Sequence, residues 1–258
     1  MDLKQFIQIA ENAAIDAGRS IMEIYDSDEF ATEIKDNATP ITRADKLAHE
    51  IITLSLAQTG LPILSEEGMN VDFKERKLWE YFWLIDPLDG TKEFIHKNGE
   101  FTVNIALMKM NVPVAGVIFR PCSGSLYSGA AGYGIYKKEH AETIQFFPLK
   151  KRKTLDELLA KENVRLVASR SHPSKETQSF SAQFKKVEVM SAGSSLKFML
   201  LLENKAEVYP RFGTTMEWDT AAAHAILNAS NRGVYKTDLT SELTYNKPDL
   251  RNPFFVAF

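Results

Sequence analysis

An unbroken apolar run that ends in acidic and turn-forming residues constrains the fold of this chain most. Residues 81–85 read Tyr-Phe-Trp-Leu-Ile, and residues 86–90 follow as Asp-Pro-Leu-Asp-Gly. Such a run is typical of a central strand that is covered on both faces. Because Pro87 cannot donate to a sheet ladder, we expect the strand to end there. Asp86 and Asp89 then lie at the carboxyl end of a buried strand, where open α/β sheets bind their ligands.

Composition describes an ordinary globular protein and excludes some classes of function. The 258 residues are 44% apolar and 25% charged, enough for one large domain or two modest ones. The net charge of −3 argues against broad binding of nucleic acid. Cys122 is the only cysteine, which excludes an intramolecular disulfide and a thiolate metal site.

The location of the protein is predicted from the same features. Residues 1–25 form an amphipathic helical pattern rather than a signal peptide. No window approaches the ~20 apolar residues that a membrane span needs. We expect a cytoplasmic protein without stable membrane insertion; peripheral association with an inner membrane is left open.

The chain divides into two halves, residues 1–150 and 151–258. The first half shows helical patterns and apolar strands, and the second alternates strands and helices, which favours a layered α/β fold. The boundary lies in the charged stretch 137–163, where the basic run 150–153 is better explained as a solvated linker than as a polyanion site. We expect helices at 3–24, 43–58, 174–184, 194–203 and 218–228, and strands at 62–66, 81–85, 101–108, 112–119, 126–136, 164–169, 187–190 and 206–209.

Each acidic segment has a plain structural explanation beside a functional one. Asp86 to Gly90 has the composition of a type I turn, yet its spacing also lets both carboxylates and the Leu88 carbonyl face one crevice. Glu66-Glu67 follows a short apolar strand, either as exposed charges or as a pair neutralised by a cation. Asp219 is either a helix N-cap or a metal ligand, roles that do not exclude each other. Asp45, at a helix start, complements the helix dipole.

Taken together, these oxygen-bearing side chains indicate a magnesium site. Carboxylates, backbone carbonyls and water are the ligands that Mg²⁺ prefers. Zinc is disfavoured because the five histidines show no paired ligand spacing. The sequence also lacks a Walker Gly-Lys-Ser/Thr loop and a Gly-x-Ser-x-Gly elbow.

Four motifs resemble the lithium-sensitive, Mg²⁺-dependent phosphomonoesterases of the inositol monophosphatase superfamily. They are Asp45 after Thr-x-Ala, Glu66-Glu67, the Asp-Pro-Leu-Asp-Gly-Thr of 86–91 and the Trp-Asp-Thr-Ala-Ala of 218–222. Further segments resemble the bacterial 3'(2'),5'-bisphosphate nucleotidase branch: residues 89–94, 98–104, 193–198 and 209–213. The resemblance implies a layered α-β-α-β-α sandwich of the sugar and inositol phosphatase type, with the site between the halves.

The resemblance also implies a set of roles. The site would hold two or three Mg²⁺ ions, with most metal ligands in the first half of the chain and the last ligand in the second. Asp45 and Thr91 would act together on the attacking water. The implied catalytic residues are Asp45, Thr91 and Glu66. The implied metal ligands are Glu66, Asp86, Leu88 (through its carbonyl), Asp89 and Asp219. The implied substrate-binding residues are Asp89, Gly90, Thr91, Ser169, His172, Gly193, Ser194, Lys197, Arg211 and Asp219.

The implied reaction is hydrolysis of the 3'-phosphate of 3'-phosphoadenosine 5'-phosphate to AMP and phosphate, in sulfur metabolism or RNA turnover. Lys197 is the first candidate for the 5'-phosphate contact, although a solvated helix position also explains it, and Arg170 is a weaker one. His172 contacts the base or sugar, or only occupies a loop. Ala223 and Thr214 depart from the glycine and proline expected in close bacterial relatives.

Three other readings of function stay open. An inositol monophosphatase or a sugar bisphosphatase would use the same metal cluster, which acts only on the ester phosphate. A non-catalytic metal- or nucleotide-binding regulator would not need Asp45 and Thr91. The sequence fixes neither the oligomeric state nor the number of metal ions.

Overall fold

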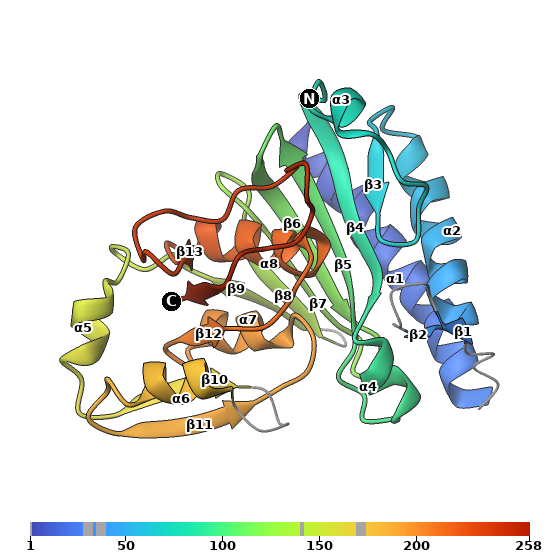
Figure 1. Ribbon diagram of the computed structural model, residues 1–258. Coiled ribbons are helices and arrows are strands. Elements are labelled where there is room, and N and C mark those ends of the chain that lie inside the picture. The colour runs from blue at the N-terminus through green and yellow to red at the C-terminus, as the bar shows by residue number, and fades with distance from the viewer. Residues whose placement is uncertain (1, 28–32, 35–39, 140–141, 169–173) are drawn as a thin grey trace.

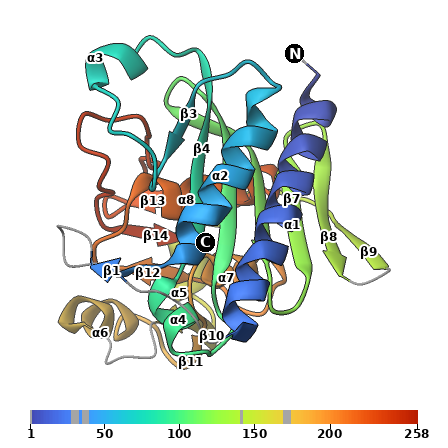
Figure 2. The same cartoon turned by 90° about the vertical axis from the view of Figure 1, so that its right-hand side faces the viewer.

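Helices and strands of this chain are arranged in five layers. The computed structural model describes residues 2–27, 33–34, 40–139, 142–168 and 174–258. Two long helices cover one face of a large twisted sheet, and a second pair of helices covers the other face (Figures 1 and 2). A smaller group of strands and two short outer helices complete the stack (Figure 1). This arrangement confirms the predicted α-β-α-β-α sandwich.

The first layer consists of α1 (Leu3–Ser27) and α2 (Arg43–Ala57). Both were predicted from apolar residues at helical spacing, and this face of α1 is buried against the sheet. The first turn of α2 is capped in both directions. The Thr42 side chain accepts a hydrogen bond from the Ala44 backbone N–H, while the Thr42 backbone N–H donates to Asp45 Oδ2 at 2.7 Å. The cap that starts the helix therefore also fixes the direction of Asp45.

The second layer is a seven-stranded sheet in which the strands follow one another in chain order. Only β3 and β4 pair in parallel; all later neighbours are antiparallel. The strands are β3 (Ile63–Ser65), β4 (Tyr81–Asp89), β5 (Thr102–Lys109), β6 (Val112–Arg120), β7 (Ser125–Ala130), β8 (Gly134–Glu139) and β9 (Glu142–Phe146). Short helices α3 (Phe73–Arg76) and α4 (Thr91–Ile95) precede and follow β4, and a two-stranded ribbon joins β1 (Glu33–Ile34) to β2 (Pro40–Ile41).

The expected end of the central strand at Pro87 is wrong. The β4 strand continues to Asp89, because the chain forms a bulge around the proline: Asp86 pairs with Asn104 and Asp89 with Thr102. Two residues, Pro87 and Leu88, therefore face one residue on β5. A bulge leaves its extra residue outside the ladder, so a proline without an N–H is tolerated there. The bulge bends the strand and so changes the direction of its acidic end.

The remaining three layers come from the second half of the chain. Helices α7 (Leu196–Leu202) and α8 (Glu217–Ala229) form the middle layer. The fourth layer contains β10 (Val164–Ala168) beside β11 (Val187–Ser191), and β14 (Phe255–Ala257) between β12 (Tyr209–Arg211) and β13 (Val234–Lys236). A bridge from Leu166 to Val208 joins the two groups. The outer helices are α5 (Leu155–Leu159) and α6 (Lys175–Ser181).

Several of these elements differ from the sequence predictions. The pattern did not predict β9, β13 or β14, and the strand expected at 206–209 pairs instead over Tyr209–Arg211. The β9 strand is exposed along most of its length, and its five residues include only two apolar side chains, Ile144 and Phe146, which is too short a pattern to predict a strand. The three-residue strands β13 and β14 are too short to show a period.

Helix α8 lies unusually close to the large sheet. A Cβ atom added at Gly116 of β6 would come within 2.0 Å of the Ala222 carbonyl oxygen. Glycine at 116 and the alanines of the helix thus allow two backbones to approach each other, which brings the N-terminal end of α8 to the end of β4. Ala223, where the predicted family pattern has glycine, is buried in the same contact layer.

Three residues of the basic run 150–153 are exposed to solvent, as expected, and Lys153 is half-buried. Arg152 also contacts Glu242 and donates to Asn228 Oδ1 at 2.9 Å, which fastens the run to the second half. The division at residue 150, which falls between β9 and α5, stays a prediction. Within the described part of the chain, no helix has the length and apolarity of a membrane span.

Candidate active site

Glu66 and Asp86 meet because β3 and β4 are parallel. Ser65 is in register with Ile85, and the Glu66 backbone N–H donates to the Ile85 carbonyl at 3.2 Å. The next residue of each strand is therefore an acid, and parallel strands present their carboxyl ends at one edge of the sheet. The predicted convergence of these two segments follows from backbone register alone.

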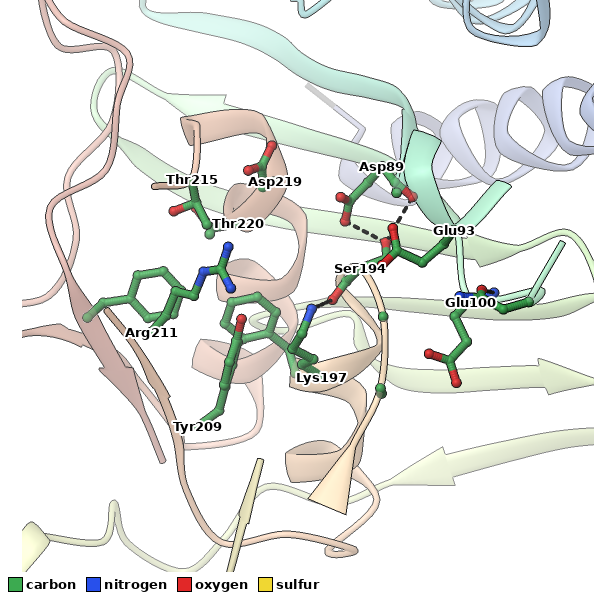
Figure 3. Close-up of a pocket in the computed structure, with 16 residues that line it drawn as sticks. Asp89, Glu93, Glu100, Ser194, Lys197, Tyr209, Arg211, Thr215, Asp219 and Thr220 are labelled. Carbon is green, nitrogen blue, oxygen red and sulfur yellow. Dashed lines mark hydrogen bonds between the residues drawn. The ribbon is translucent and has the colours of Figure 1, made fainter. Parts of the chain in front are cut away.

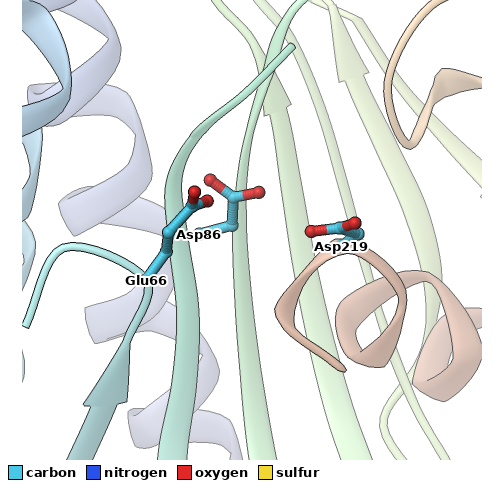
Figure 4. A group of neighbouring side chains, drawn as sticks. All are labelled: Glu66, Asp86 and Asp219. Carbon is cyan, nitrogen blue, oxygen red and sulfur yellow. The ribbon is translucent and has the colours of Figure 1, made fainter. Parts of the chain in front are cut away.

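Asp219 approaches the same point from the opposite layer. It is the third residue of α8, and its Oδ2 accepts the backbone N–H of Met216 at 2.8 Å. The prediction that Asp219 itself is the N-cap is therefore wrong, because Met216 occupies that position. One ligand atom from each of Glu66, Asp86 and Asp219 lies within 4.8 Å of the other two (Figure 4). We call these three residues the acidic trio.

The acidic trio is electrostatically unfavourable without a cation. Burial, followed by the charges of Glu66, Asp89 and Asp219, raises the pKa of Asp86 well above its usual range. Burial and the nearby Asp89 likewise raise the pKa of Asp219. All donors in the cluster are carboxylate oxygens, which suit a hard divalent cation better than zinc or copper. The residues present therefore suit the predicted metal.

Asp45 and Thr91 form a hydrogen-bonded pair beside the trio. The Thr91 hydroxyl lies 3.1 Å from Asp45 Oδ1 and 3.4 Å from the Leu88 carbonyl. Asp45 Oδ2 is already occupied by the backbone N–H and the hydroxyl of Thr42, the latter at 2.6 Å. Only Oδ1 thus remains for Thr91. Burial raises the pKa of Asp45, which makes it a stronger base than an exposed aspartate.

The carboxylate of Asp89, unlike those of the acidic trio, is hydrogen-bonded to the start of α7. Its Oδ2 accepts hydrogen bonds from the Ser194 hydroxyl at 2.5 Å, the Ser195 backbone N–H at 2.8 Å and the Asn104 amide at 3.3 Å. These contacts fasten the end of β4 to the start of α7, across the two halves of the chain. Asp89 and the Leu88 carbonyl were both predicted as metal ligands, and these roles stay predictions.

A cavity of about 280 Å³ opens beside Asp89 and Asp219. Figure 3 shows Arg211 and Lys197 entering it from one side and Glu93 and Glu100 from the other. The cavity thus has a cationic wall from the second half and an acidic wall from the first. Its lining residues are Asp89, Gly90, Glu93, Asn98, Glu100, Ala192, Gly193, Ser194, Lys197, Phe198, Tyr209, Arg211, Thr215, Asp219, Thr220 and Phe255.

Lys197 is held inside the cavity rather than in solvent. Its ammonium donates to the Ser194 carbonyl at 3.0 Å and lies 5.9 Å from the centre of the Tyr209 ring. Burial lowers the pKa of Lys197, while the Asp89 charge acts in the opposite direction. The explanation of Lys197 as a solvated helix residue is therefore wrong. Arg211 lines the same wall, and one of its terminal nitrogens donates to the Thr214 carbonyl at 3.3 Å.

Gly193 permits the close contact that brings Ser194 to Asp89. A Cβ atom at Gly193 would lie 2.6 Å from the Glu100 carbonyl oxygen. Ser194 has a φ of 52°, a left-handed conformation that few non-glycine residues adopt. Gly90, also predicted at the site, has a φ of 94° and is the N-cap residue of α4. Both glycines are thus required by backbone geometry next to the cavity.

Several functional positions were not assigned by sequence reasoning. Glu93, Glu100 and Tyr209 line the cavity, and Thr102 and Asn104 join the hydrogen-bond network around Asp89. All five lie in segments that resembled the nucleotidase branch, which was the signal available for them. Ser169, Arg170 and His172 lie outside the described residues.

Comparisons with known proteins found a matching family and similar sequences. The sequence model of the inositol monophosphatase family matches residues 2–252. The 3'(2'),5'-bisphosphate nucleotidase CysQ of Buchnera aphidicola is 43% identical over 247 residues, covering 95% of this chain and 87% of that protein. The enzyme of the same name from Salmonella typhimurium is 40% identical over 259 residues, covering 96% and 98%.

The crystal structure of CysQ from Bacteroides thetaiotaomicron, described as a bacterial member of the inositol monophosphatase family, is also similar. It has a TM-score of 0.85 and 43% identity, and the match covers 99% of this chain and 97% of that one. The predicted resemblance to the superfamily and to its bacterial nucleotidase branch is confirmed. The chain belongs to the inositol monophosphatase family.

Proposed function

We propose that this protein is a divalent-metal-dependent phosphomonoesterase that hydrolyses the 3'-phosphate of adenosine 3',5'-bisphosphate to give AMP and phosphate. The observation that carries the proposal is the position of the acidic trio, beside the Asp45–Thr91 pair and next to a cavity with a cationic wall. The enzymes named in the comparisons as 3'(2'),5'-bisphosphate nucleotidases support the choice of substrate.

The metal centre would be formed by Glu66, Asp86 and Asp219, with Asp89 and the Leu88 carbonyl as further ligands. When bound, Mg²⁺ supplies positive charge that neutralises the phosphate dianion and polarises the scissile ester and the attacking water. We infer two or three ions per site, which leaves room for a ligand role of Asp89 in addition to its contacts with α7.

Asp45 and Thr91 would move the proton of the attacking water. The Thr91 hydroxyl donates its proton to Asp45 Oδ1, so its oxygen lone pairs are free to accept from a water. The water's proton then passes to Thr91 as the hydroxyl proton passes to Asp45 Oδ1. Thr42 holds Asp45 Oδ2 in place throughout. A buried base whose pKa is raised toward the working pH is suited to this step.

Lys197 and Arg211 would recognise the phosphate that is not cleaved. Both cations lie on the wall of the cavity opposite Glu93 and Glu100 (Figure 3). A charge-assisted hydrogen bond to phosphate is stronger than a neutral one, so this wall favours substrates with a second phosphate. Ser169 and His172 keep their proposed role as nucleotide contacts.

The test is a phosphate-release panel at saturating Mg²⁺. We expect adenosine 3',5'-bisphosphate to have a kcat/KM at least about tenfold higher than inositol 1-phosphate and fructose 1,6-bisphosphate, and Li⁺ to inhibit the reaction. The sulfated nucleotide related to the bisphosphate is a further substrate to include. A preference for inositol phosphate or fructose bisphosphate would replace the proposed substrate, and binding of nucleotide without phosphate release would contradict enzyme function.

A further inference from the structure

A buried carboxylate lies behind the helix that carries Asp219. Glu217 is the first residue of α8 and is fully buried. Since successive helical residues turn by about 100°, its side chain and that of Asp219 point to roughly opposite sides of the helix. Glu217 thus faces away from the acidic trio, and the reaction described above does not use it.

Glu217 is bound by the segment that leads to β14, residues 244–252, which we call the strap. Its Oε2 accepts the backbone N–H of Asn246 at 2.5 Å. Its Oε1 accepts the backbone N–H of Lys247 at 3.1 Å and the Lys247 ammonium at 2.5 Å. In Figure 1 the red segment that contains the strap passes over α8 before it returns to β14. The first turn of α8 is therefore held from behind.

The strap is in turn fastened to the segment that follows Glu66. Asn246 donates through Nδ2 to the Arg76 carbonyl and accepts from Arg76 Nη1 through Oδ1, both at 2.8 Å. Arg76 is buried at the end of α3 and also donates to the Pro248 carbonyl at 3.1 Å. Asn246 has a φ of 55°, a left-handed conformation that asparagine adopts more readily than most residues.

The metal site has two walls of its own, the segment that runs from Glu66 to α3 and the helix α8 that carries Asp219. These contacts connect the two walls on the side that faces away from the acidic trio. Glu66 precedes α3 on one wall and Asp219 lies on α8 on the other, and Glu217, Asn246 and Arg76 join α8 to α3. We propose that Glu217, through Asn246 and Arg76, is a positioning residue that sets the separation of Glu66 and Asp219 and thereby the affinity for the metal. The inference rests on the proposed metal centre.

Packing alone does not explain a charged group at this position. Apolar residues of similar volume often stabilise a core as well as a buried ion pair does, because desolvation of the charges offsets their attraction. Directional hydrogen bonds, in contrast, define a single arrangement of the groups they join. The network should therefore affect the geometry of the trio more than the general stability of the fold.

The test compares two buried glutamates. Glu217→Gln replaces the carboxylate by an amide of the same shape. Glu11→Gln is the matched control, since Glu11 is also fully buried, contacts the Lys138 ammonium at 2.5 Å, and lies on α1 across the sheet from α8. Isothermal titration with MgCl₂ in the absence of substrate gives the metal Kd, and thermal unfolding without metal gives Tm. Groups that orient metal ligands change metal affinity by about 10–100-fold when removed.

We expect Glu217→Gln to raise the Kd for Mg²⁺ about tenfold or more and Glu11→Gln to change it less than about twofold. This difference should remain even if the two substitutions lower Tm by similar amounts. Equal Kd values in wild type and Glu217→Gln would overturn the inference. If the wild-type protein bound no Mg²⁺ at all, the proposed metal centre would fail instead, so the two failures are distinguishable.

A second variant isolates the connection to α3. Asn246→Gly keeps the left-handed backbone and the N–H that Glu217 accepts, and removes only the two hydrogen bonds to Arg76. This variant decides the question if Glu217→Gln does not fold. We expect a rise in the metal Kd of about threefold or more. A wild-type Kd in Asn246→Gly would contradict the proposed route through Asn246, because only the Arg76 hydrogen bond to the Pro248 carbonyl would then join the strap to α3.

Discussion

The two walls of the site are positioned by different physical means. On the β3–β4 wall, backbone register alone places Glu66 beside Asp86, and a helix cap directs Asp45. On the α7–α8 wall, helix starts and loops present Asp219, Ser194 and Lys197, and side-chain contacts hold them. The first wall thus supplies fixed acids for the chemistry, and the second supplies both the last acid and the cations of the cavity. Substitutions on the two walls should therefore affect different kinetic parameters.

The largest effect is expected on the β3–β4 wall. Asp86→Asn removes a charge from the centre of the acidic trio, so the metal centre should be weakened and kcat/KM should fall by roughly 10³-fold or more, equivalent to about 4 kcal/mol of lost transition-state stabilisation. The measurement is phosphate release over a range of Mg²⁺ concentrations. Asp16→Asn, which alters an exposed carboxylate paired with Arg19 on α1, should retain wild-type activity. Near-normal turnover of Asp86→Asn would remove Asp86 from the metal site.

The next effect separates proton transfer from metal binding on the same wall. Asp45→Asn should lower kcat by roughly 10²–10⁴-fold, the usual contribution of a general base, while calorimetry detects an unchanged affinity for Mg²⁺. Thr91→Val should resemble it, and Thr91→Ser, which keeps the hydroxyl, should remain active. A loss of metal affinity in Asp45→Asn that accounts for the whole loss of rate would assign Asp45 to the metal site instead.

A smaller and more selective effect is expected on the α7–α8 wall. Lys197→Ala removes a cation from the cavity, so KM for adenosine 3',5'-bisphosphate should rise by about 10–100-fold, the value of a hydrogen bond to a charged group. KM for adenosine 3'-monophosphate, which lacks the second phosphate, should change little. Lys205→Ala, at an exposed lysine paired with Glu203, is the control. Equal changes for both substrates would contradict the assignment of Lys197 to the second phosphate.

The last and smallest effect concerns stability and not rate, at His224, which is buried on α8. Glu242 only accepts, so the His224 Nε2 at 3.0 Å carries the proton, and Nδ1 accepts from the Tyr245 hydroxyl at 2.9 Å. Burial lowers the pKa of His224 to about 3. The unfolded chain therefore binds a proton below about pH 6.5 that the folded protein does not bind, and stability falls as pH drops from about 6.5 toward 3.

This pH dependence can be measured by urea unfolding between pH 4 and 7. His224 should contribute a slope of up to about 1.4 kcal/mol per pH unit in that window. His224→Gln, which cannot titrate, should flatten the slope, whereas His96→Gln, at an exposed position, should leave it unchanged. An identical slope in wild type and His224→Gln would contradict the neutral buried imidazole.

Sequence reasoning predicted the parts of the fold that follow local rules. The spacing of apolar residues located α1, α2 and most strands of the large sheet, and turn composition placed the acids near strand ends. The continuation of β4 through Pro87 was missed because a bulge depends on the pairing partner, β5, and not on the sequence of β4. The strands β13 and β14 were missed because their pairing is non-local and each spans three residues.

The sequence predicted which residues form the site better than it predicted the contacts that hold these residues in place. Motif resemblance named Glu66, Asp86, Asp219, Asp45 and Thr91, and the structure places them together. No pattern indicated that Asp89 binds the start of α7, or that Glu217 binds the strap, because these contacts join residues more than twenty positions apart. Contacts of this kind depend on how the layers pack, which residue spacing does not encode.

The most direct test of the account is a crystal structure of the protein grown with Mn²⁺ in place of Mg²⁺, with anomalous scattering used to locate the ion. The account predicts an anomalous peak between the carboxylates of Glu66, Asp86 and Asp219, with oxygen ligands from both walls. The account would be contradicted by an anomalous map that shows no such peak at a saturating Mn²⁺ concentration, in a structure where these carboxylates point away from one another.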